Sequence, residues 1–382
     1  MNPAPRIVVF GTAGHAIVHL RRARAMHDRG EIVLAGACDI REPPDEARQL
    51  LPDNAVVARD PIDLFSRAGA DIAVVATPPH AHLPLGRLAL AAGCHLLVEK
   101  PPVLDLAAFD QLSGLAGSRG RACQTGFQSF GSAAVPVVRD AIARGEIGAV
   151  TGIAAAGAWI RRDRYFGRTE WAGRRRVGGQ AVVDGTLTNP FAHAVATALL
   201  LNGTAEVLPE SAIVELYRAR NIESDDTACA RMRFAGAPDV VVAATLAAEA
   251  DNDPYILIHG SGGQIRWHYK TDLVVVNGVG VEVAPPEDLL ANLVRHVQAP
   301  EAVPLLAPLA VTRAFTAMVE AVRDAPEPRA LPAEWVRSVG SGPERRFVIP
   351  GIDRNVDTAA DRLALFSELA LPWTGAGFRA CG

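Results

Sequence analysis

One of only two lysines in this chain lies where chemistry is expected. Two of the 38 basic residues are lysine, and one of them, Lys100, occurs in the motif Glu99-Lys100-Pro101-Pro102 after a short apolar run. All other basic residues are arginine, so a retained lysine raises the question of whether a guanidinium could replace it. A lysine can hydrogen-bond a reacting hydroxyl and carry its proton, whereas an arginine stays protonated. Lys100 is therefore a candidate acid or base, and a surface lysine is the alternative.

A glycine-rich turn lies near the start of the chain, in Gly11-Thr12-Ala13-Gly14-His15-Ala16. It follows an apolar run and precedes a helical pattern, which is the position of a dinucleotide-binding turn. The first glycine allows a tight turn, and small residues let the backbone and the helix N-terminus approach a pyrophosphate. Ala13 stands where a second glycine is usual. The turn by itself fits a purely structural connection equally well.

Polar residues follow two further apolar runs, in Cys38-Asp39 and in Ala76-Thr77-Pro78-Pro79. In an open parallel sheet, ligands bind beyond the carboxyl ends of the strands. A carboxylate at Asp39 can bind the hydroxyls of an adenosine ribose and repels a 2′-phosphate, so it favours NAD over NADP. Arg41 could offset this preference, and a helix cap is the alternative role of Asp39.

Seven arginines are concentrated in residues 161–176, with Tyr165, Phe166 and Trp171 between them. One interpretation is a solvated loop in an arginine-rich protein. The other is a cleft edge that recognises an anionic group, such as a carboxylate or a diphosphate.

The first 125 residues predict a scaffold for these groups, a parallel sheet covered by helices. Apolar runs predict buried strands at Ile7–Phe10, Ile32–Ala37, Ile72–Ala76, His95–Val98 and Ala122–Thr125. Helical patterns occupy Ala16–Arg29, Asp45–Leu51, Pro61–Ala68, Leu83–Ala92 and Leu106–Ser118. This alternation is typical of right-handed βαβ units. We therefore predict an α/β protein with a doubly wound Rossmann domain at residues 1–125.

Residues 126–382 predict a second domain of the α+β type with an open, mostly antiparallel sheet. In Thr227–Phe234 apolar and polar residues alternate, as in a half-buried antiparallel strand. Similar runs occur at Ala212–Tyr217, Val240–Ala247, Tyr255–His259, Gln264–His268 and Leu273–Val276, and helices are expected at Ala133–Arg144, Asn189–Leu201 and Ala310–Arg323. Residues 324–332 and 341–351 are expected to be loops. A sheet with helices on one side leaves a face for another subunit, so we expect a homo-oligomer, either a dimer or a tetramer.

Composition excludes several classes of protein. The formal net charge of −4 argues against a nucleic-acid surface, and no run of about 18 apolar residues could span a membrane. The five cysteines are scattered and form no CxxC pair, so we expect no disulfide framework and no bound metal. The first six residues contain no apolar signal region. These observations favour a cytoplasmic protein with a small-molecule substrate.

Together, these motifs resemble the Gfo/Idh/MocA oxidoreductases in order and spacing. The matching segments are Gly11-x-x-Gly14-His15-Ala16-x-x-His19, Cys38-Asp39, Ala76-Thr77-Pro78-Pro79-x-x-His82, Glu99-Lys100-Pro101, Gly126-Phe127-Gln128, residues 142–148, Gly178-Gly179 through Asp184, and residues 365–369. The resemblance implies NAD(P)-dependent redox chemistry on sugars, polyols or their derivatives. The cofactor-binding residues that it implies are Gly11, Thr12, Ala13, Gly14, His15, Ala16, Asp39, Thr77, Pro78, His82, Glu99 and Gln128.

One motif departs from the family pattern. Members commonly carry an aspartate and, four residues later, a histidine; Asp184 matches the aspartate, but Thr188 occupies the histidine position. If a helix starts near Asn189, then Asn189 and His193 lie one turn apart on the same face. His193 is then a candidate acid or base, with Asp184 as the orienting group. The alternative for His193 is a core histidine on an apolar helix.

We therefore expect an oxidoreductase that transfers a hydride between NAD(P) and a carbinol or carbonyl carbon of a sugar-like substrate. The catalytic candidates are Lys100, His193 and Asp184, and the substrate-binding candidates are Lys100, Gln128, Trp171, Thr188 and Asn189. Two other functions fit the same sequence. One is a non-catalytic NAD(P)-responsive regulatory protein, and the other is an NAD-retaining lyase or glycosidase.

Overall fold

The computed structural model describes residues 3–374. The chain forms two compact units: unit 1 comprises residues 1–131 and 287–310, and unit 2 comprises residues 132–286 and 311–382. Each unit has its own sheet and is described by itself. Within residues 3–374, no helix has the length and apolar character needed to cross a membrane.

Unit 1 is built on a six-stranded parallel sheet of order β3-β2-β1-β4-β5-β6. The strands are β1 (Arg6–Phe10), β2 (Val33–Cys38), β3 (Val56–Ala58), β4 (Ile72–Val75), β5 (His95–Val98) and β6 (Cys123–Thr125). Strand order reverses between β1 and β4, as in the doubly wound nucleotide-binding fold. The predicted Rossmann fold is confirmed, and β3 is a short strand that the sequence analysis did not include.

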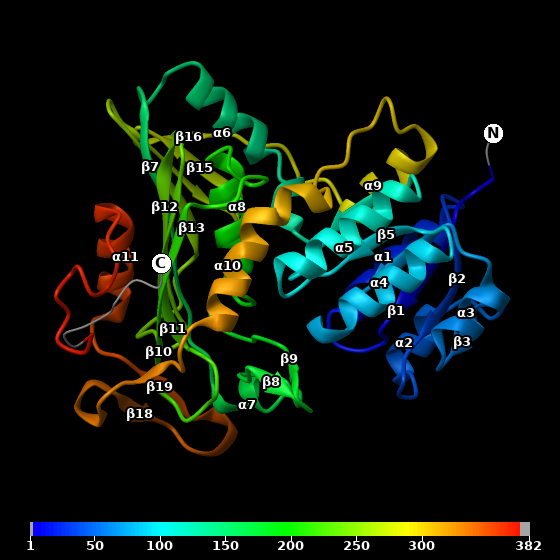
Figure 1. Cartoon of the computed structure of the whole chain (residues 1–382), viewed down its shortest axis with the longest axis horizontal. Coiled ribbons are helices and arrows are strands. Elements are labelled where there is room, and N and C mark those ends of the chain that lie inside the picture. The colour runs from blue at the N-terminus through cyan, green and yellow to red at the C-terminus, as the bar shows by residue number, and fades with distance from the viewer. Residues whose placement is uncertain (1–2, 375–382) are drawn as a thin grey trace. The chain divides into compact units, whose positions relative to one another are not determined.

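Helices connect these strands (Figure 1): α1 (Ala16–Asp28), α2 (Asp45–Leu50), α3 (Pro61–Ala68), α4 (His82–Ala91) and α5 (Leu106–Ser118). Two of them begin at an aspartate that caps the helix. Asp60 accepts a hydrogen bond from the N–H of Ile62, and Asp105 accepts one from the N–H of Ala108, both at 2.7 Å. Every residue of β4 is buried, because a parallel sheet of this kind is covered on both faces.

A segment from much later in the chain completes unit 1. Residues 287–310 contain α9 (Leu289–Gln298), for which the sequence analysis predicted no helix. The side chain of Gln124 on β6 donates to the carbonyl of Leu289 and accepts a 3.1 Å hydrogen bond from the N–H of Ala307. The unit boundaries therefore differ from the expected single division at residue 125. These contacts join residues far apart in the chain, so no local pattern indicates them.

Unit 2 is built on a nine-stranded sheet of order β16-β15-β14-β13-β7-β12-β11-β10-β17. Its strands are β7 (Val150–Ala158), β10 (Ser211–Arg218), β11 (Thr227–Phe234), β12 (Ala237–Thr245), β13 (Tyr255–Gly260), β14 (Gln264–His268), β15 (Leu273–Val276), β16 (Val279–Val281) and β17 (Arg329–Ala330). Neighbouring strands are antiparallel except for β7 with β12 and β10 with β17. The predicted open, mostly antiparallel sheet is confirmed.

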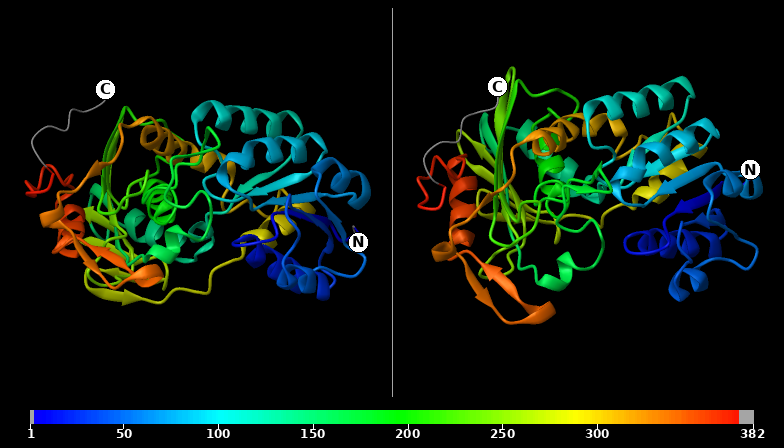
Figure 2. Two further views of the ribbon diagram at one scale, coloured as in Figure 1. Left: turned by 90° about the horizontal axis from the view of Figure 1, so that it is seen from below. Right: turned by 60° about the horizontal axis from the view of Figure 1, so that its bottom comes forward.

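Both faces of the central strands in this sheet are covered. The helices α8 (Ala192–Leu201) and α10 (Arg313–Asp324) lie on one face, and α11 (Ile352–Arg362) lies on the other (Figures 1 and 2). Strand β11 is buried along almost its whole length. The prediction of a half-buried strand there is wrong, because residues 363–368, which follow α11, cover its polar side chains: Arg231 binds Glu368 and the carbonyl of Leu363. The face that was expected to receive another subunit carries this helix, so it gives no support to a homo-oligomer.

The helix predicted at residues 189–201 begins later than expected. Helix α8 starts at Ala192, after a turn that contains Asn189 and Pro190. A proline disfavours helical backbone angles in the residue before it, so Asn189 stays outside the helix. The other helices are closer to expectation: α6 spans Ala134–Ala143, and α10 follows a 3-10 turn at Leu309–Thr312.

Two segments expected to be loops contain short strands. Strand β17 pairs with β10, and β18 (Arg337–Val339) forms a hairpin with β19 (Arg346–Val348). A smaller ribbon joins β8 (Arg176–Val177) to β9 (Gln180–Ala181). Strands of two or three residues are too short to produce an alternating pattern in the sequence.

Candidate active site

The glycine-rich turn lies between the carboxyl end of β1 and the start of α1. Gly11 has a φ of +98°, and a Cβ at this position would lie 2.6 Å from the carbonyl oxygen of Ala76, so no side chain fits. Gly14 has a φ of +60° and nothing within 4 Å of a Cβ position. The exposed residues of the turn are Ala13, Gly14 and His15. The backbone of the turn and the N-terminus of α1 are thus accessible to a diphosphate, so the residues present fit a dinucleotide.

The carboxylate of Asp39 is fixed at the carboxyl end of β2. It accepts hydrogen bonds from the backbone N–H of Thr12 at 2.8 Å and from the Thr12 hydroxyl at 2.9 Å. Its other oxygen accepts a 3.0 Å hydrogen bond from the N–H of Arg41. Because Thr12 belongs to the glycine-rich turn, these bonds join the turn and Asp39 into one edge. A dinucleotide fold places a ribose-binding carboxylate at this position.

The loop after β4 contains buried polar atoms without partners. The hydroxyl of Thr77 and Nδ1 of His80 are buried and form no hydrogen bond with any residue that the structure describes. Burial also lowers the pKa of His80. Since buried polar groups are nearly always hydrogen-bonded, these atoms fit a site that a polar ligand completes. Thr77 and the neighbouring Pro78 remain predicted cofactor contacts, and the unpaired hydroxyl of Thr77 is consistent with that prediction.

His82 has a different position from the one expected. Its ring nitrogens lie 2.7 Å from the carbonyl oxygens of Thr77 and Pro101, and burial lowers its pKa. It therefore joins the loop after β4 to the loop after β5. Because both ring nitrogens have backbone partners, neither is left to bind a ligand in this structure.

Glu99 is a buried carboxylate surrounded by hydrogen-bond donors. Its Oε1 lies 2.8 Å from Nε2 of His19 and 3.3 Å from Nε2 of His15. The side-chain amide of Gln128 donates to the same oxygen at 3.4 Å, and the backbone N–H of Lys100 donates to Oε2 at 3.1 Å. Burial alone raises the pKa of Glu99, but the hydrogen bonds from the two histidines bring it well below its ordinary value. The cluster therefore holds an ionised carboxylate.

The backbone around Lys100 is held on both sides. Glu99 binds the N–H of Lys100, and His82 binds the carbonyl oxygen of the next residue, Pro101. Gly126 leaves room for the Glu99 side chain, because a Cβ there would lie 2.6 Å from Oε1. Lys100 is thus placed at the carboxyl end of β5 by groups whose own positions are fixed.

His15, His19 and Glu99 also offer three possible metal-ligand atoms within 4.8 Å of one another. A histidine that binds a metal usually has its second ring nitrogen hydrogen-bonded, which fixes the ring. Nδ1 of His19 is buried and has no such partner among residues 3–374. Hydrogen bonds to the carboxylate explain this cluster without a metal. The sequence analysis named His15 and Glu99 as separate cofactor contacts, and the four-residue spacing of His15 and His19 was the signal that they share a helix face.

In unit 2, Asp184 holds other predicted residues together. Its Oδ2 accepts a 2.7 Å hydrogen bond from the N–H of Gly173, and its Oδ1 accepts one from the side-chain amide of Asn189. Nη2 of Arg168 lies 3.9 Å from Oδ2. Asp184 is buried, so its carboxylate is oriented by these contacts and in turn orients the amide of Asn189.

Thr188 belongs to the hydrogen bonding of its own loop. Its hydroxyl donates to the carbonyl of Val183 and accepts a 3.0 Å hydrogen bond from the N–H of Gly185. The residue is 1% exposed. A buried hydroxyl with these partners is not available to a ligand, so the structure does not support the predicted substrate contact of Thr188.

His193 is half-buried in the first turn of α8. Because Asn189 precedes the helix, the predicted pairing of Asn189 and His193 on one helix face is wrong. Phe191, which lies between them, packs over Gly157 of β7, where a Cβ would lie 2.1 Å from the ring. The same ring stacks on Trp159 at 4.3 Å between centroids. These contacts fix the segment that carries His193 against the central strand of the sheet.

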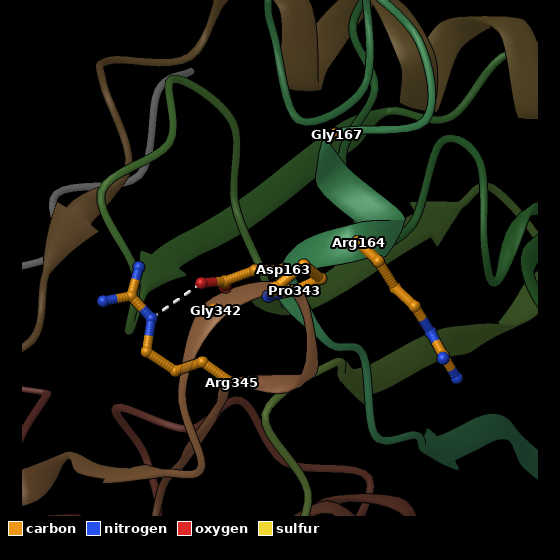
Figure 3. Close-up of a pocket in the computed structure, with 6 residues that line it drawn as sticks. All are labelled: Asp163, Arg164, Gly167, Gly342, Pro343 and Arg345. Atoms are coloured by element: carbon orange, nitrogen blue, oxygen red, sulfur yellow. Dashed lines mark hydrogen bonds and ion pairs between the residues drawn. The ribbon is translucent and has the colours of Figure 1, made fainter.

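A separate hollow of about 510 Å³ lies where α7 (Asp163–Phe166) meets the turn before β19 (Figure 3). Its lining residues are Asp163, Arg164, Gly167, Gly342, Pro343 and Arg345. Asp163 binds Nε of Arg345 at 2.6 Å and Nη1 of the buried Arg220 at 2.8 Å. Because this carboxylate ties two arginines and two chain segments together, we interpret the hollow as a structural junction. Arg164, one of the seven arginines of residues 161–176, lines it, but no predicted catalytic, cofactor-binding or substrate-binding residue does.

The fold and these residues define a protein with a dinucleotide-binding Rossmann unit and a second α+β unit. Residues 5–127 match the family described as "Oxidoreductase family, NAD-binding Rossmann fold", and residues 136–266 match the "GFO/IDH/MocA C-terminal domain". The chain therefore belongs to the Gfo/Idh/MocA oxidoreductase family, and the resemblance found in the sequence is confirmed.

Similar proteins include two enzymes named for sugar substrates. The dTDP-3,4-didehydro-2,6-dideoxy-alpha-D-glucose 3-reductase of Streptomyces antibioticus is 30% identical over 154 residues, which are 40% of this chain and 47% of the relative. The D-glucoside 3-dehydrogenase of Escherichia coli (strain K12) is 25% identical over 156 residues, 41% of this chain and 44% of the relative. The chain thus spans about half the length of the curated relatives it matches.

Among solved structures, the WlbA dehydrogenase from Bordetella pertussis, in complex with NADH and UDP-GlcNAcA, is similar in fold. The TM-score is 0.68 at 21% sequence identity, over 86% of this chain and 98% of that chain.

Proposed function

We propose that this protein is an NAD-dependent oxidoreductase that transfers a hydride between the cofactor and a carbinol carbon of a sugar or sugar derivative. The observation that carries the proposal is the edge of unit 1, where the exposed glycine-rich turn, the fixed carboxylate of Asp39 and the Lys100 loop occupy the carboxyl ends of β1, β2 and β5. Family membership and the names of the two curated relatives support the redox chemistry and the substrate class.

The preference for NAD over NADP rests on Asp39. Its two oxygens accept backbone hydrogen bonds from Thr12 and Arg41, which orient the carboxylate. A carboxylate at the ribose position accepts hydrogen bonds from the hydroxyls of NAD and repels the 2′-phosphate of NADP. The contact of Arg41 with Asp39 is through the backbone N–H of Arg41, so the guanidinium of Arg41 is the group that could offset this preference.

The bound nicotinamide supplies the hydride acceptor or donor. Lys100 hydrogen-bonds the substrate oxygen and carries its proton, while the Glu99 cluster keeps the backbone of Lys100 in place. In unit 2, Asp184 orients Asn189 toward substrate, and His193 is the second candidate proton carrier. We place Gln128 and Trp171 with the groups that bind substrate.

The two curated relatives that are named for sugar substrates are both named for reaction at position 3, so we propose the C3 carbinol as the reacting group. Incubation with NAD⁺ and a glucoside deuterated at C3 should transfer the label to C4 of the nicotinamide, as measured by proton NMR of the reduced cofactor. Reduced cofactor that contains no deuterium would contradict this position.

The proposed function is tested by following absorbance at 340 nm with NAD⁺ and a panel of sugars. Lys100→Ala and Lys100→Arg should each lower kcat/KM by about 10²–10⁴-fold, because neither side chain can carry the proton. Both variants should bind NADH like the wild type in a fluorescence titration. Full turnover by Lys100→Ala would contradict the role of Lys100. Cofactor binding without turnover of any sugar would favour a regulatory protein, and sugar conversion without net reduction of NAD⁺ would favour a lyase or glycosidase.

A further inference from the structure

The structure divides the seven arginines of residues 161–176 into two groups. Five of them contact no aromatic ring within residues 3–374 and bind carboxylates or backbone carbonyls. Three form ion pairs: Arg162 and Arg164 with Glu344 at 3.2 and 2.6 Å, and Arg174 with Glu223 at 3.7 Å. The other two donate to backbone carbonyls. Arg176 donates to Gly179 at 3.3 Å, and Arg175 donates to Val322, Arg323, Ala325 and Pro326. The remaining two are Arg161 and Arg168, and both stack on aromatic rings.

These two arginines form a row with a lysine from another segment. Arg161 lies 4.6 Å from the ring centre of Trp159 and 5.1 Å from that of Tyr165. Arg168 lies 3.6 Å from the ring centre of Tyr165 and 5.3 Å from that of Trp171. Nζ of Lys270, the second lysine of the chain, lies 5.1 Å from the ring centre of Trp159. We call Trp159, Arg161, Tyr165, Arg168, Trp171 and Lys270 the cation–aromatic row.

The cation–aromatic row adjoins the residues of unit 2 that we assign to substrate. At one end, Trp159 stacks on Phe191, which lies between Asn189 and His193 in the chain. Toward its other end, Arg168 lies 3.9 Å from Asp184. The row therefore borders the segment from Asp184 to His193.

The cations of the row have few partners within the protein. Arg161 has five N–H groups, and its hydrogen bond within the described residues is to the carbonyl of Ile160 at 3.1 Å. In residues 3–374, no carboxylate forms an ion pair with Arg161 or Lys270. Arg168 donates to the carbonyl of Tyr165 at 2.7 Å and meets Asp184 only at 3.9 Å, longer than a charge-assisted hydrogen bond.

Stacking restricts these cations without neutralising them. A guanidinium over a ring gains attraction from the ring face and still presents its N–H edge to a ligand. Asp184 lies 3.9 Å from Arg168, and Asp251 accepts a 2.7 Å hydrogen bond from the N–H of Ile160, next to Arg161. Three cations beside these two carboxylates leave the row with an excess of positive charge. A planar array of N–H donors of this kind matches the oxygens of a carboxylate or a phosphate.

We propose that the cation–aromatic row binds an anionic group, a carboxylate or a phosphate, carried by the sugar substrate. This inference rests on the proposed function, because it names the substrate class of the same site. Arg161 and Lys270 supply the charge, and the rings hold them in place.

The test compares sugars that differ in charge. Isothermal titration calorimetry of the NADH-loaded protein with D-glucose, D-glucuronate, glucose 1-phosphate and UDP-glucose should show at least tenfold tighter binding of an anionic sugar than of D-glucose. Tighter binding of D-glucuronate alone would identify a carboxylate, and tighter binding of glucose 1-phosphate or UDP-glucose alone would identify a phosphate. Affinity for the anionic sugar should fall as the salt concentration rises.

Arg161→Gln and Lys270→Gln should each lower the ratio of anionic to neutral affinity by about 5–20-fold, the loss of one charge-assisted contact. The matched control is Arg174→Gln, an exposed arginine of the same segment, which should keep the wild-type ratio. Arg168 is left intact because its removal would also disturb Asp184. An unchanged ratio in both variants, or no preference for any anionic sugar in the wild type, would overturn the inference.

The calorimetric experiment needs no turnover, so it separates the two proposals. Charge-dependent sugar binding without reduction of NAD⁺ would support anion binding by the cation–aromatic row and contradict the proposed function. Turnover of neutral sugars, with the same ratio of anionic to neutral affinity in the wild type and both variants, would support the proposed function and contradict anion binding by the row.

Discussion

At the scale of single residues, Glu99 is the group on which the Lys100 loop depends. It is buried, ionised and bound by His15, His19 and the N–H of Lys100. All of these contacts are to groups of the protein, and none is to a reacting atom. We therefore assign Glu99 as a positioning residue that acts through Lys100.

Replacing this carboxylate tests the assignment. Glu99→Gln should lower kcat by about 10–10²-fold, because displacement of a catalytic group by around 1 Å can cost this much. Its KM for sugar should change by less than threefold, since an effect confined to proton transfer leaves ground-state binding intact. Steady-state kinetics at 340 nm gives both values. A variant in which KM rises and kcat is unchanged would indicate that Glu99 contacts the substrate.

We propose that Asp39 sets the preference between the two nicotinamide cofactors. Asp39→Ala should weaken NADH binding by about 10–10²-fold, the loss of hydrogen bonds to a charged group, and should not weaken NADPH binding. Fluorescence titration with both cofactors measures the change. Asp45→Ala, at an exposed aspartate in the first turn of α2, is the control and should bind both cofactors as the wild type does. Equal loss for NADH and NADPH would show that Asp39 only supports the turn.

At the scale of elements, Arg175 stabilises the C-terminal end of α10. The last carbonyls of a helix have no partner within the helix. Nη2 of Arg175 donates to the carbonyls of Val322, Arg323 and Ala325 at 3.0, 2.8 and 2.7 Å. An arginine of the loop before Asp184 is thus bound to a helix that packs on the sheet.

Loss of this cap should destabilise unit 2. Arg175→Ala should lower the free energy of unfolding by about 1–3 kcal/mol, because several buried or half-buried carbonyls lose a charged donor. Arg175→Lys should recover only part of the loss, since an ammonium cannot reproduce the planar array of donors. Urea unfolding followed by circular dichroism measures both. The control is Arg176→Ala, at an exposed residue one position away. It should change the free energy of unfolding by less than about 0.5 kcal/mol, as an ordinary surface substitution does. An equal effect of the two alanine substitutions would contradict the capping role of Arg175.

At the scale of the whole molecule, the chain forms two units, each with its own sheet and buried cysteines. Cys38, Cys94 and Cys123 lie in unit 1, and Cys229 lies in unit 2; Cys381 lies outside the described residues. Burial raises the pKa of Cys38 and Cys94 to about 11 and that of Cys123 to about 12, and it also raises the pKa of Cys229. Only the thiolate reacts with alkylating reagents, so these thiols report the opening of their own units.

The four thiols should be unreactive in the native protein at pH 8, well below their raised pKa values, and should react in urea. If unit 1 binds the cofactor, NADH at about 100 times its Kd should stabilise it by about 2.7 kcal/mol. Cys38, Cys94 and Cys123 should then require more urea for labelling, and Cys229 should not. Alkylation followed by peptide mass spectrometry distinguishes the sites. The same shift at Cys229 would show that the two units unfold as one.

The sequence by itself determined the fold class and predicted the strand ends at which the cofactor is proposed to bind. Short apolar runs alternating with helical patterns are local signals, and the glycine-rich turn, Asp39 and Lys100 follow those runs directly. A parallel sheet brings the ends of such runs to one edge, so their neighbourhood could be derived without coordinates.

Only the tertiary structure decided how residues far apart in the chain meet. Three features depend on contacts that no local pattern encodes. Residues 287–310 return to unit 1, α11 covers the second sheet, and His15 and His19 cluster around Glu99. The same holds for Thr188, whose hydroxyl binds its own loop, and for Lys270, which lies over Trp159. The physical reason is that secondary structure follows from periodicity along the chain, whereas the partners of a polar side chain follow from packing.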